Sequence, residues 1–585
     1  MTSTTTTTDT APPGVRSIAD RLLLDLSPTD PVAARAARAA GLSVDVPLLS
    51  ASDPAAVDDR LAAHQRVLSA LRSAVPKDCA VPNDPAVPND TADLDLAAAI
   101  ADRAQAELSL HAVGFGAEQL APLACVPQRL RSEIGQALDS AALASIAGSG
   151  PAAVDSGWSR AAESLRALPS ALRGHRDTVQ RAVAEGRVPT RRQVLAVAGQ
   201  CGDWIDPAGS DWFRAQLTRA PQAQRSAVAQ AIDSAVGGVR EYRAFLLDLA
   251  PHARTRDAVG PETYTVTAGA YLGDDVDPHE LSAWGQHELH RITAEIDTLA
   301  RTIHPDGPAA AAAQLDADPA RLLHTGPQVE RWLEQTLQRS CEVLDGRFVT
   351  LPEHRLPRCR ISDSGAGVMY YEPAEVDARA PGTVWWAREP GVPVHTWREH
   401  STAHHEGVPG HHLQIALAAE NPELHAWQRF CCHVHGHAEG WAHHAESWAG
   451  EIGLLEDPAD RLGMLMAQAW RAARIVIDTG LHLGLRPPRG VVDGDPEHWT
   501  IPAAEQFLRR ISGLGAVAAR FEVERYLGWP GQALAFRVGA RLFDEILAGA
   551  RRRPGFEERT YRTSLLQRGA MGLRPLRDRV LTTVQ

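Results

Sequence analysis

Several side chains suited to metal chemistry stand close together in the second half of the chain. Glu406 follows His405 directly, and His411 and Glu439 come six and 34 residues after His405. Imidazole and carboxylate groups are common ligands of transition metals. Twelve of the chain's 24 histidines lie within residues 395–444. This concentration predicts a site that binds a metal ion and activates water.

The spacing of the two histidines needs an explanation. In the usual zinc-binding helix two histidines stand four residues apart and face the same way. Here Pro409 occupies the fourth position after His405. On an unbroken helix His411 would lie about 120° around the axis and about 9 Å along it. Because proline lacks an N–H and glycine tolerates unusual backbone angles, Pro409 and Gly410 predict a break that turns His411 towards His405.

A carboxylate from a following helix is expected to complete the ligand set. Glu439 is the preferred third ligand, and Glu446, seven residues later on the same helical face, is the alternative. Glu406, beside a ligand, is expected to be the general base. The predicted ion is one Zn²⁺, with another divalent transition metal as the alternative. Groups expected to orient the ligands, or to replace one of them, are His412, His435, His443 and Glu446.

The elements that must position these groups are mostly helical. Amphipathic helices are predicted at residues 278–301, 327–344, 461–483, 516–526 and 531–550. Thr500 and Pro502 are typical of a helix start. Short β-rich segments at residues 348–351, 360–362, 369–371 and 383–386 predict one small sheet just before the histidine motif. The fold class is therefore mainly α, with a small sheet beside the metal motif.

The chain is too long for a single core. At 585 residues it exceeds the roughly 250–300 residues at which one hydrophobic core stops growing. We expect a disordered N-terminus at residues 1–15 and a helical region at 16–340 that forms one wall of a cleft. Residues 341–585 are expected to hold the sheet and the metal site.

Composition excludes several classes of function. The net charge of −13 argues against a nucleic-acid partner. No apolar stretch reaches the roughly 18 residues of a membrane span, and the first residues lack the layout of a secretory signal, so a soluble cytoplasmic protein is predicted. Seven scattered cysteines favour reduced thiols. The only lysine, Lys77, lies in a Pro/Asp-rich loop, which excludes Schiff-base and P-loop chemistry.

A set of ordered motifs resembles the domain of unknown function 885 family (DUF885), bacterial proteins regarded as metallopeptidase-like. The phrase His-Glu-Gly-Val-Pro-Gly-His-His-Leu-Gln at residues 405–414 is similar to the family signature. Together the matches cover roughly residues 370–540. They lie at residues 370–371, 381–383, 405–414, 439–442, 445–447, 474–482, 522–526 and 529–534.

The resemblance implies a two-lobed, deep-clefted, zincin-like architecture similar to thimet oligopeptidases and thermostable carboxypeptidases. It also implies zinc held by His405, His411 and a downstream glutamate, with Glu406 as the base. From the C-terminal motifs, Tyr526 and His482 are expected to stabilise an oxyanion.

Three further residues are expected to contact substrate: Tyr371, Arg525 and Arg537, the arginines through paired hydrogen bonds to a carboxylate. The chain departs from the family where Phe536 and Arg537 replace an expected Tyr-Lys pair. If that tyrosine serves catalysis in the family, its absence weakens the case for ordinary peptidase activity.

The leading functional hypothesis is a cytoplasmic zinc-dependent peptidase acting on short peptides. The alternative is a metalloenzyme on the same scaffold whose substrate is an amide-containing small molecule, such as an amidase or a tailoring enzyme of a specialised pathway. A third class, a protein that binds metal or peptide without turnover, requires a coordination sphere with no open position. No nucleic-acid or membrane partner is expected, and a homodimer is an open alternative to a monomer.

Overall fold

The computed structural model describes residues 14–74, 91–123, 125–146, 150–206, 210–362, 369–374, 376 and 380–582. This part of the chain is mainly helical, as the sequence predicts, and carries two small sheets. Of the predicted disordered N-terminus, residues 1–13 lie outside the described ranges, and Val15 already begins helix α1. Lys77 also lies outside them. No helix in the described ranges has the length and apolar character needed to cross a membrane.

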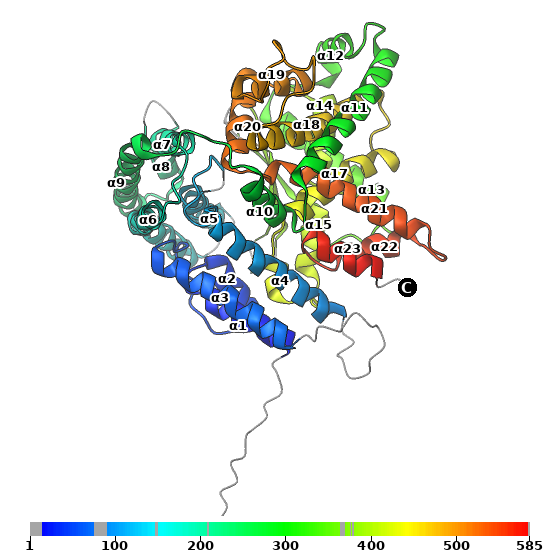
Figure 1. The fold of residues 1–585 in the computed structure, drawn as a ribbon. Coiled ribbons are helices and arrows are strands. Elements are labelled where there is room, and N and C mark those ends of the chain that lie inside the picture. The colour runs from blue at the N-terminus through cyan, green and yellow to red at the C-terminus, as the bar shows by residue number, and fades with distance from the viewer. Residues whose placement is uncertain are drawn as a thin grey trace, which may run out of the picture.

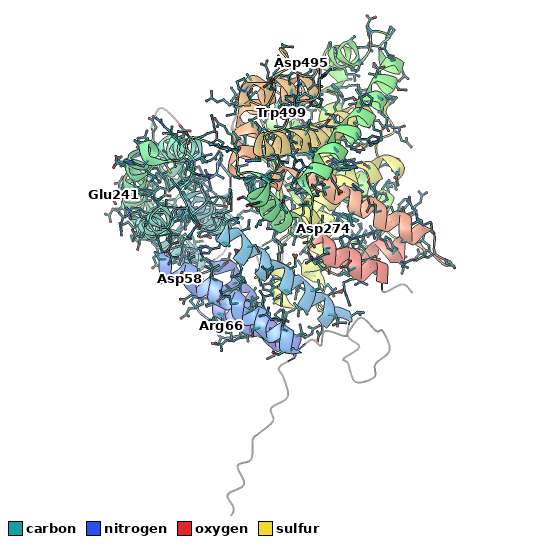
Figure 2. All side chains as sticks on the ribbon, viewed as in Figure 1. Asp58, Arg66, Glu241, Asp274, Asp495 and Trp499 are labelled. Atoms are coloured by element: carbon teal, nitrogen blue, oxygen red, sulfur yellow. The ribbon has the colours of Figure 1, made fainter. Side chains whose placement is uncertain are left out.

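The first hydrophobic core joins both ends of the chain around the helices of the histidine motif. Figure 1 shows α4 running close to α23. Arg568 and Arg579 both donate to the carboxylate of Asp95, at 2.7 and 2.6 Å. Asp274, labelled in Figure 2, accepts two hydrogen bonds of 2.9 Å from Arg577. The helices are α1 (Val15–Leu26), α2 (Pro31–Ala39), α3 (Pro54–Ala74), α4 (Thr91–Ala112), α10 (Pro261–Leu272), α15 (His411–Glu420), α16 (Ala426–Phe430), α17 (His435–Glu451), α21 (Ala535–Arg551), α22 (Glu558–Leu566) and α23 (Leu573–Thr582).

The second core is built from residues 120–253, together with Leu49. It comprises α5 (Val126–Ile146), α6 (Pro151–Ala184), α7 (Arg191–Ile205), α8 (Trp212–Ala215) and α9 (Arg225–Leu249). These helices gather at one side of the molecule in Figure 1. Within this core the buried His175 donates from Nε2 to the carbonyl of Ala117, and its Nδ1 accepts from the hydroxyl of Tyr242, both at 2.8 Å.

The third core surrounds α18 (Pro458–Leu483), which the sequence predicts at residues 461–483. Gly285 lets α11 approach closely, because a Cβ there would lie 2.7 Å from Cγ2 of Ile475. Trp499, labelled in Figure 2, packs on α18 where Gly480 leaves room. Thr500 caps α19, as expected, by accepting from the amide of Ala503. The other helices are α11 (Pro278–Ile303), α12 (Pro308–Asp316), α14 (Thr396–Glu406), α19 (Ile501–Ser512) and α20 (Ala516–Gly528).

The strands lie next to α13 (Gly326–Leu344), which shares the fourth core with them. The larger sheet has the order β2–β4–β3, with β4 parallel to β2 and antiparallel to β3. A second sheet pairs β1 with β5, so the prediction of one sheet is wrong. The strands are β1 (Leu322–Leu323), β2 (Arg358–Ser362), β3 (Tyr370–Glu372), β4 (Thr383–Ala387) and β5 (Val394–His395).

The strand predicted at residues 348–351 is also wrong. The amides of Arg347 and Phe348 turn back to the carbonyl of Leu344 at 3.2 and 3.0 Å, so this segment finishes α13. Only an isolated bridge joins Val349 to Asp345. The β-rich composition there fills the first core instead, where Val349 is fully buried.

Three of the four cores cross residue 340, where the sequence suggests a boundary between regions. The first core includes both Tyr264 and Trp441, the third both Leu289 and Trp397, and the fourth both Leu333 and Trp386. The sheet and the metal-motif helices therefore share their cores with helices that precede residue 341.

The buried imidazole in the second core makes stability depend on pH. Burial lowers the pKa of His175 to about 4, whereas an unfolded histidine titrates near pH 6.5. As the pH falls, His175 of the unfolded chain is therefore protonated before His175 of the folded protein. The stability contributed by neutral His175 is complete above about pH 6.5 and is lost as the pH falls towards 4.

We predict that acidification from pH 7 to pH 5 removes about 2 kcal/mol of stability through this residue. His175→Gln should flatten the pH dependence of urea unfolding by that amount. His287→Gln, on the exposed face of α11, is the control and should leave the dependence as it is in the wild type. If the free energy of unfolding depended on pH equally in all three proteins, His175 would not be the source of the pH dependence.

Candidate metal centre

The histidine motif spans a break between two helices. Helix α14 ends at Glu406, and α15 begins at His411. The amide of Gly407 still donates to the carbonyl of Ala403 at 3.0 Å. The amide of Gly410 donates instead to the carbonyl of His404, six residues before it, at 2.9 Å. The break predicted from the proline and glycine is therefore present.

Glycine is required at the break because the backbone folds onto itself there. A Cβ at Gly410 would overlap the carbonyl oxygens of His404 and His405, and one at Gly407 would overlap the side chain of Leu337. The indole N–H of Trp441 donates to the carbonyl of Pro409 at 3.0 Å. This bond attaches the break to α17, the helix that carries Glu439.

Three predicted ligands meet at the break. His405, His411 and Glu439 each offer one ligand atom, and these atoms all lie within 4.8 Å of one another. Oε2 of Glu439 lies 3.3 Å from Nε2 of His405 and 3.5 Å from Nε2 of His411. The two imidazole rings stand at 87° with their centres 4.9 Å apart. Two imidazoles and one carboxylate form a donor set that suits Zn²⁺.

Glu446 orients the first of these ligands from behind. Its Oε1 lies 2.8 Å from Nδ1 of His405 and 3.2 Å from Nδ1 of His443, while its Oε2 accepts from the hydroxyl of Ser401 at 2.6 Å. Burial opposes ionisation of Glu446, but the charge of Arg471 and the two histidines hold its pKa well below the usual range. A carboxylate behind a ligating histidine fixes its tautomer and ring orientation. Glu446 thus takes the orienting position, and Glu439 takes the ligand position.

Electrostatics favour positive charge between the helices. Burial disfavours a protonated His405, yet hydrogen bonds with Glu439 and Glu446 outweigh burial and raise the pKa of His405 to about 9. The pKa of Glu439 is held well below its usual range, against burial, by its contacts with His405 and His411. The two carboxylates therefore favour positive charge at His405.

Glu406, the residue expected to be the base, directly follows His405 in the chain. It is the last residue of α14, 7% exposed, and its carboxylate forms no hydrogen bond with the described part of the chain. Phe536 of α21 lies over the ring of His405, with centroids 6.0 Å apart and planes at 19°. The phenylalanine that departs from the family pattern therefore packs against a candidate ligand.

Two of the predicted site histidines point elsewhere. His412 faces the sheet, where its Nε2 donates to the carbonyl of His354 at 2.8 Å and its Nδ1 meets the hydroxyl of Tyr371 at 3.1 Å. It is not an alternative ligand, and Tyr371 is engaged by it. His482 is fully buried, and both its ring nitrogens meet the backbone, at the amide of Val259 and the carbonyl of Tyr526. Neither nitrogen is free to bind an oxyanion.

The predicted tyrosine and arginines are already paired. The phenol of Tyr526 donates to Glu522 at 2.7 Å, and burial raises its pKa. Arg525 donates to the same carboxylate at 2.9 Å and to Gln532 at 2.6 Å. Arg537 is bound to Glu288 through Nε, at 2.9 Å, and Nη2.

His435 lies one helical turn before Glu439 on α17 but is not among the three clustered ligands. Its ring packs edge-on against Trp529, with centroids 5.1 Å apart. Burial lowers the pKa of His435 to about 3. It forms an aromatic wall close to Glu439.

Three residues that were not among the predicted site residues also belong to the surroundings of the site, although Arg474 begins the family-like motif at residues 474–482. Ser401 is bound to Glu446, and Arg471 lies 3.6 Å from the same carboxylate. Arg474 lies over the ring of Phe536, with its guanidinium carbon 4.6 Å from the centroid. Ser401 stands one helical turn before His405, and this spacing is the one signal that could have pointed to it.

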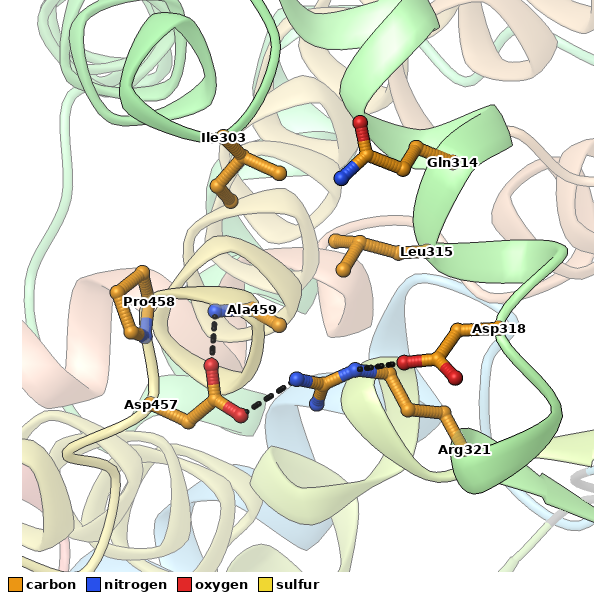
Figure 3. Close-up of a pocket in the computed structure, with 8 residues that line it drawn as sticks. All are labelled: Ile303, Gln314, Leu315, Asp318, Arg321, Asp457, Pro458 and Ala459. Carbon is orange, nitrogen blue, oxygen red and sulfur yellow. Dashed lines mark hydrogen bonds and ion pairs between the residues drawn. The ribbon is translucent and has the colours of Figure 1, made fainter.

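A pocket elsewhere on the surface does not contribute to this site. Its volume is about 400 Å³, and Figure 3 shows Arg321 crossing it between Asp318 and Asp457. Arg321 donates to Asp457 at 2.7 Å, and Asp457 caps α18 through the amide of Ala459. Arg321 forms ion pairs with Asp318 and Asp457, and none of the lining residues belongs to the cluster of candidate ligands.

Comparison with known proteins defines the family. The chain belongs to the family described as bacterial proteins of unknown function, DUF885, whose sequence profile matches residues 36–580. The match extends the likeness well beyond residues 370–540, so the N-terminal helices belong to the family fold. No curated protein matches the chain.

Two solved structures share the fold. A crystal structure from Colwellia psychrerythraea, provisionally described as a lipoprotein, has a TM-score of 0.78 and 19% identity over 97% of this chain and 98% of that chain. A structure from Shewanella oneidensis, provisionally described as a lipoprotein of unknown function, has a TM-score of 0.65 and 14% identity over 97% and 99%. At these identities the likeness concerns the fold alone.

We predict that Gly410→Ala destabilises the protein by at least about 2 kcal/mol, because a Cβ there overlaps backbone oxygens that cannot move independently of α14. The matched control is Gly450→Ala on α17, where the nearest atom would be 3.8 Å away. That change should be neutral or slightly stabilising. Urea unfolding of the two variants checks this, and equal stabilities would contradict the steric role of Gly410.

Proposed function

We propose that the protein is a zinc-dependent hydrolase that cleaves amide bonds of short peptides. The observation that carries the proposal is the meeting of His405, His411 and Glu439 within 4.8 Å, from helices on both sides of the break. Glu446 behind His405 supports it, since such a carboxylate is typical of zinc-binding histidines.

The residues present fit this ion and the reaction. Zinc held by the three ligands would lower the pKa of water and polarise an amide carbonyl. Glu406 would take a proton from the attacking water and pass it to the leaving nitrogen, and its carboxylate has no hydrogen bond within the described chain to give up first. Tyr526 would have to release Glu522 before it could donate to a substrate oxygen. We therefore assign Tyr526 no direct role, and His482 none.

The proposal includes the two-lobed, zincin-like architecture implied by the family resemblance. A deep cleft between two lobes would admit narrow, flexible chains and exclude folded proteins. Short peptides are the substrate class that suits such an opening. Cytoplasmic action on such peptides stays a prediction.

One observation favours a second candidate, an enzyme on the same scaffold acting on a non-peptide amide. Phe536 lies over His405 and has no hydroxyl to donate to an oxyanion, whereas the family pattern leads us to expect tyrosine there. Screening short peptides against small amide metabolites, each with a chelator control, separates the two candidates.

We predict that purified protein contains one zinc ion per chain by elemental analysis and that His405→Ala loses it. Glu406→Gln should keep the ion and lower kcat for any amide substrate by at least about 100-fold, the usual contribution of a general base. Glu241→Gln, at a position 73% exposed on α9, is the control and should match the wild type.

Two results would count against the proposal. Zinc-free protein that remains active with a chelator present would remove the metal from the reaction. Undiminished hydrolysis by Glu406→Gln would leave the metal but remove Glu406 as the base.

A further inference from the structure

Two buried arginines of α18 have no part in the proposed chemistry. Arg471 and Arg474 stand one turn apart and are 7% and 5% exposed. The Nε of Arg471 and both Nε and Nη1 of Arg474 are shielded from solvent and have no hydrogen-bond partner within the described residues. Leaving a buried charged donor unpaired costs more than the roughly 1–3 kcal/mol of a neutral one. Nη1 of Arg471 donates to the carbonyl of Ala467 at 3.3 Å, and Nη2 of Arg474 lies 3.2 Å from Glu522, so each guanidinium group is only partly paired.

These arginines adjoin the metal centre. Both guanidinium groups lie over the ring of Phe536, at 5.9 and 4.6 Å from its centroid, and that ring is stacked on His405. Both also lie over Trp470, at 5.4 and 4.4 Å. The unpaired donors thus stand in an aromatic enclosure beside one candidate ligand.

The neighbouring carboxylates are already committed. Glu522 is shared by Tyr526, Arg525 and Nη2 of Arg474, the last at 3.2 Å. Glu446 is taken by the orienting contacts described above, with Nη2 of Arg471 3.6 Å away. Glu399 influences Arg471 electrostatically, but its hydrogen bond is with Thr402.

From these contacts we infer that Arg471 and Arg474 bind a carboxylate of the substrate. Guanidinium groups bind carboxylates through two parallel charge-assisted hydrogen bonds, and the rings of Trp470 and Phe536 strengthen such bonds by excluding water. The inference rests on the proposed function and narrows it. The substrate is an amide whose product side or acyl side carries a free carboxylate, such as a peptide with an unblocked C-terminus.

The inference differs from the expectation drawn from the sequence. Arg525 and Arg537 were the arginines expected to bind a carboxylate, but their donors reach Glu522, Gln532 and Glu288. The unpaired donors belong instead to α18. Arg474 is expected to supply most of the selectivity, because two of its three nitrogens lack a partner.

The test compares a ligand with and without the carboxylate. Acetyl-Ala-Ala-Phe and its C-terminal amide are titrated calorimetrically into zinc-loaded Glu406→Gln protein, in which hydrolysis is suppressed. We expect the free acid to bind about 10- to 100-fold more tightly than the amide. Arg474→Met in the same background should remove this preference, and Arg474→Lys should restore only part of it, because lysine lacks the guanidinium fork. Arg541→Met, at an exposed ion pair of α21, is the matched control and should retain the full preference.

Equal affinity for acid and amide would overturn the inference, as would failure of either peptide to bind, or a preference that survives in both Arg474→Met and Arg471→Met. If these variants do not fold, benzoate competition with the free acid in otherwise unchanged protein decides the matter, and absence of competition rejects the subsite. Failure of the metal proposal appears separately, as absence of zinc in elemental analysis. A preference for the acid in zinc-free protein would support the subsite alone.

Discussion

The geometry of the site depends on the break between α14 and α15, whose two sides stay in close contact. The carbonyl oxygens of His404 and His405 approach the α-carbon of Gly410 so closely that no side chain fits there. Trp441 then holds the interruption against α17 through Pro409. Two histidines that would diverge on a regular helix are brought to face a common point, and the helix that supplies the carboxylate is attached to the same turn. Backbone packing thus positions the ligands before any ion contributes.

Around this turn, charge is arranged in layers. Glu439 faces the point where the histidines converge, Glu446 lies behind His405, and Arg471 lies beyond Glu446. Glu446 is fully buried and Glu439 is half-buried, and contacts with neighbouring histidines and, for Glu446, Arg471 hold the pKa of each carboxyl well below its usual range. Because interactions between charges are stronger away from water, a change in the charge of one of these residues alters the electrostatic energy of its neighbour. The excess donors of Arg474 stand at the outer edge of this arrangement, where it remains incomplete.

The sequence was sufficient for the parts of the site that depend on local chemistry. The proline and glycine predicted the break, and Glu439, the preferred third ligand, lies with His405 and His411, whereas the alternative, Glu446, lies behind His405. Long amphipathic segments such as α11 and α18 were predicted to within a few residues of their ends. These features depend on neighbours in the chain, which a single sequence displays.

Other features depend on which elements meet in space, and these the sequence did not reveal. His412 and His482 have the right chemistry but face a strand and a backbone carbonyl. Residues 348–351 have strand-like composition, but they fill a core at the end of α13. Which arginines keep unpaired donors depends on the acidic groups that pack opposite them. Arg537 pairs with Glu288 of α11, which lies some 250 positions earlier in the chain, and no local sequence pattern predicts that pairing.

The shared first core has a consequence for the order in which the protein can mature. Helix α4 packs against α23 within this core, and Asp95 of α4 is paired with Arg568 and Arg579, which follow it by more than 470 residues. During synthesis on the ribosome the N-terminal helices emerge long before these partners. Native contacts so distant along the chain form slowly and leave apolar surface exposed meanwhile. Phe536 and α21, which pack against His405 and α17, arrive in the same late segment. The candidate metal centre therefore lacks its packing against Phe536 and α21 until that segment has been synthesised.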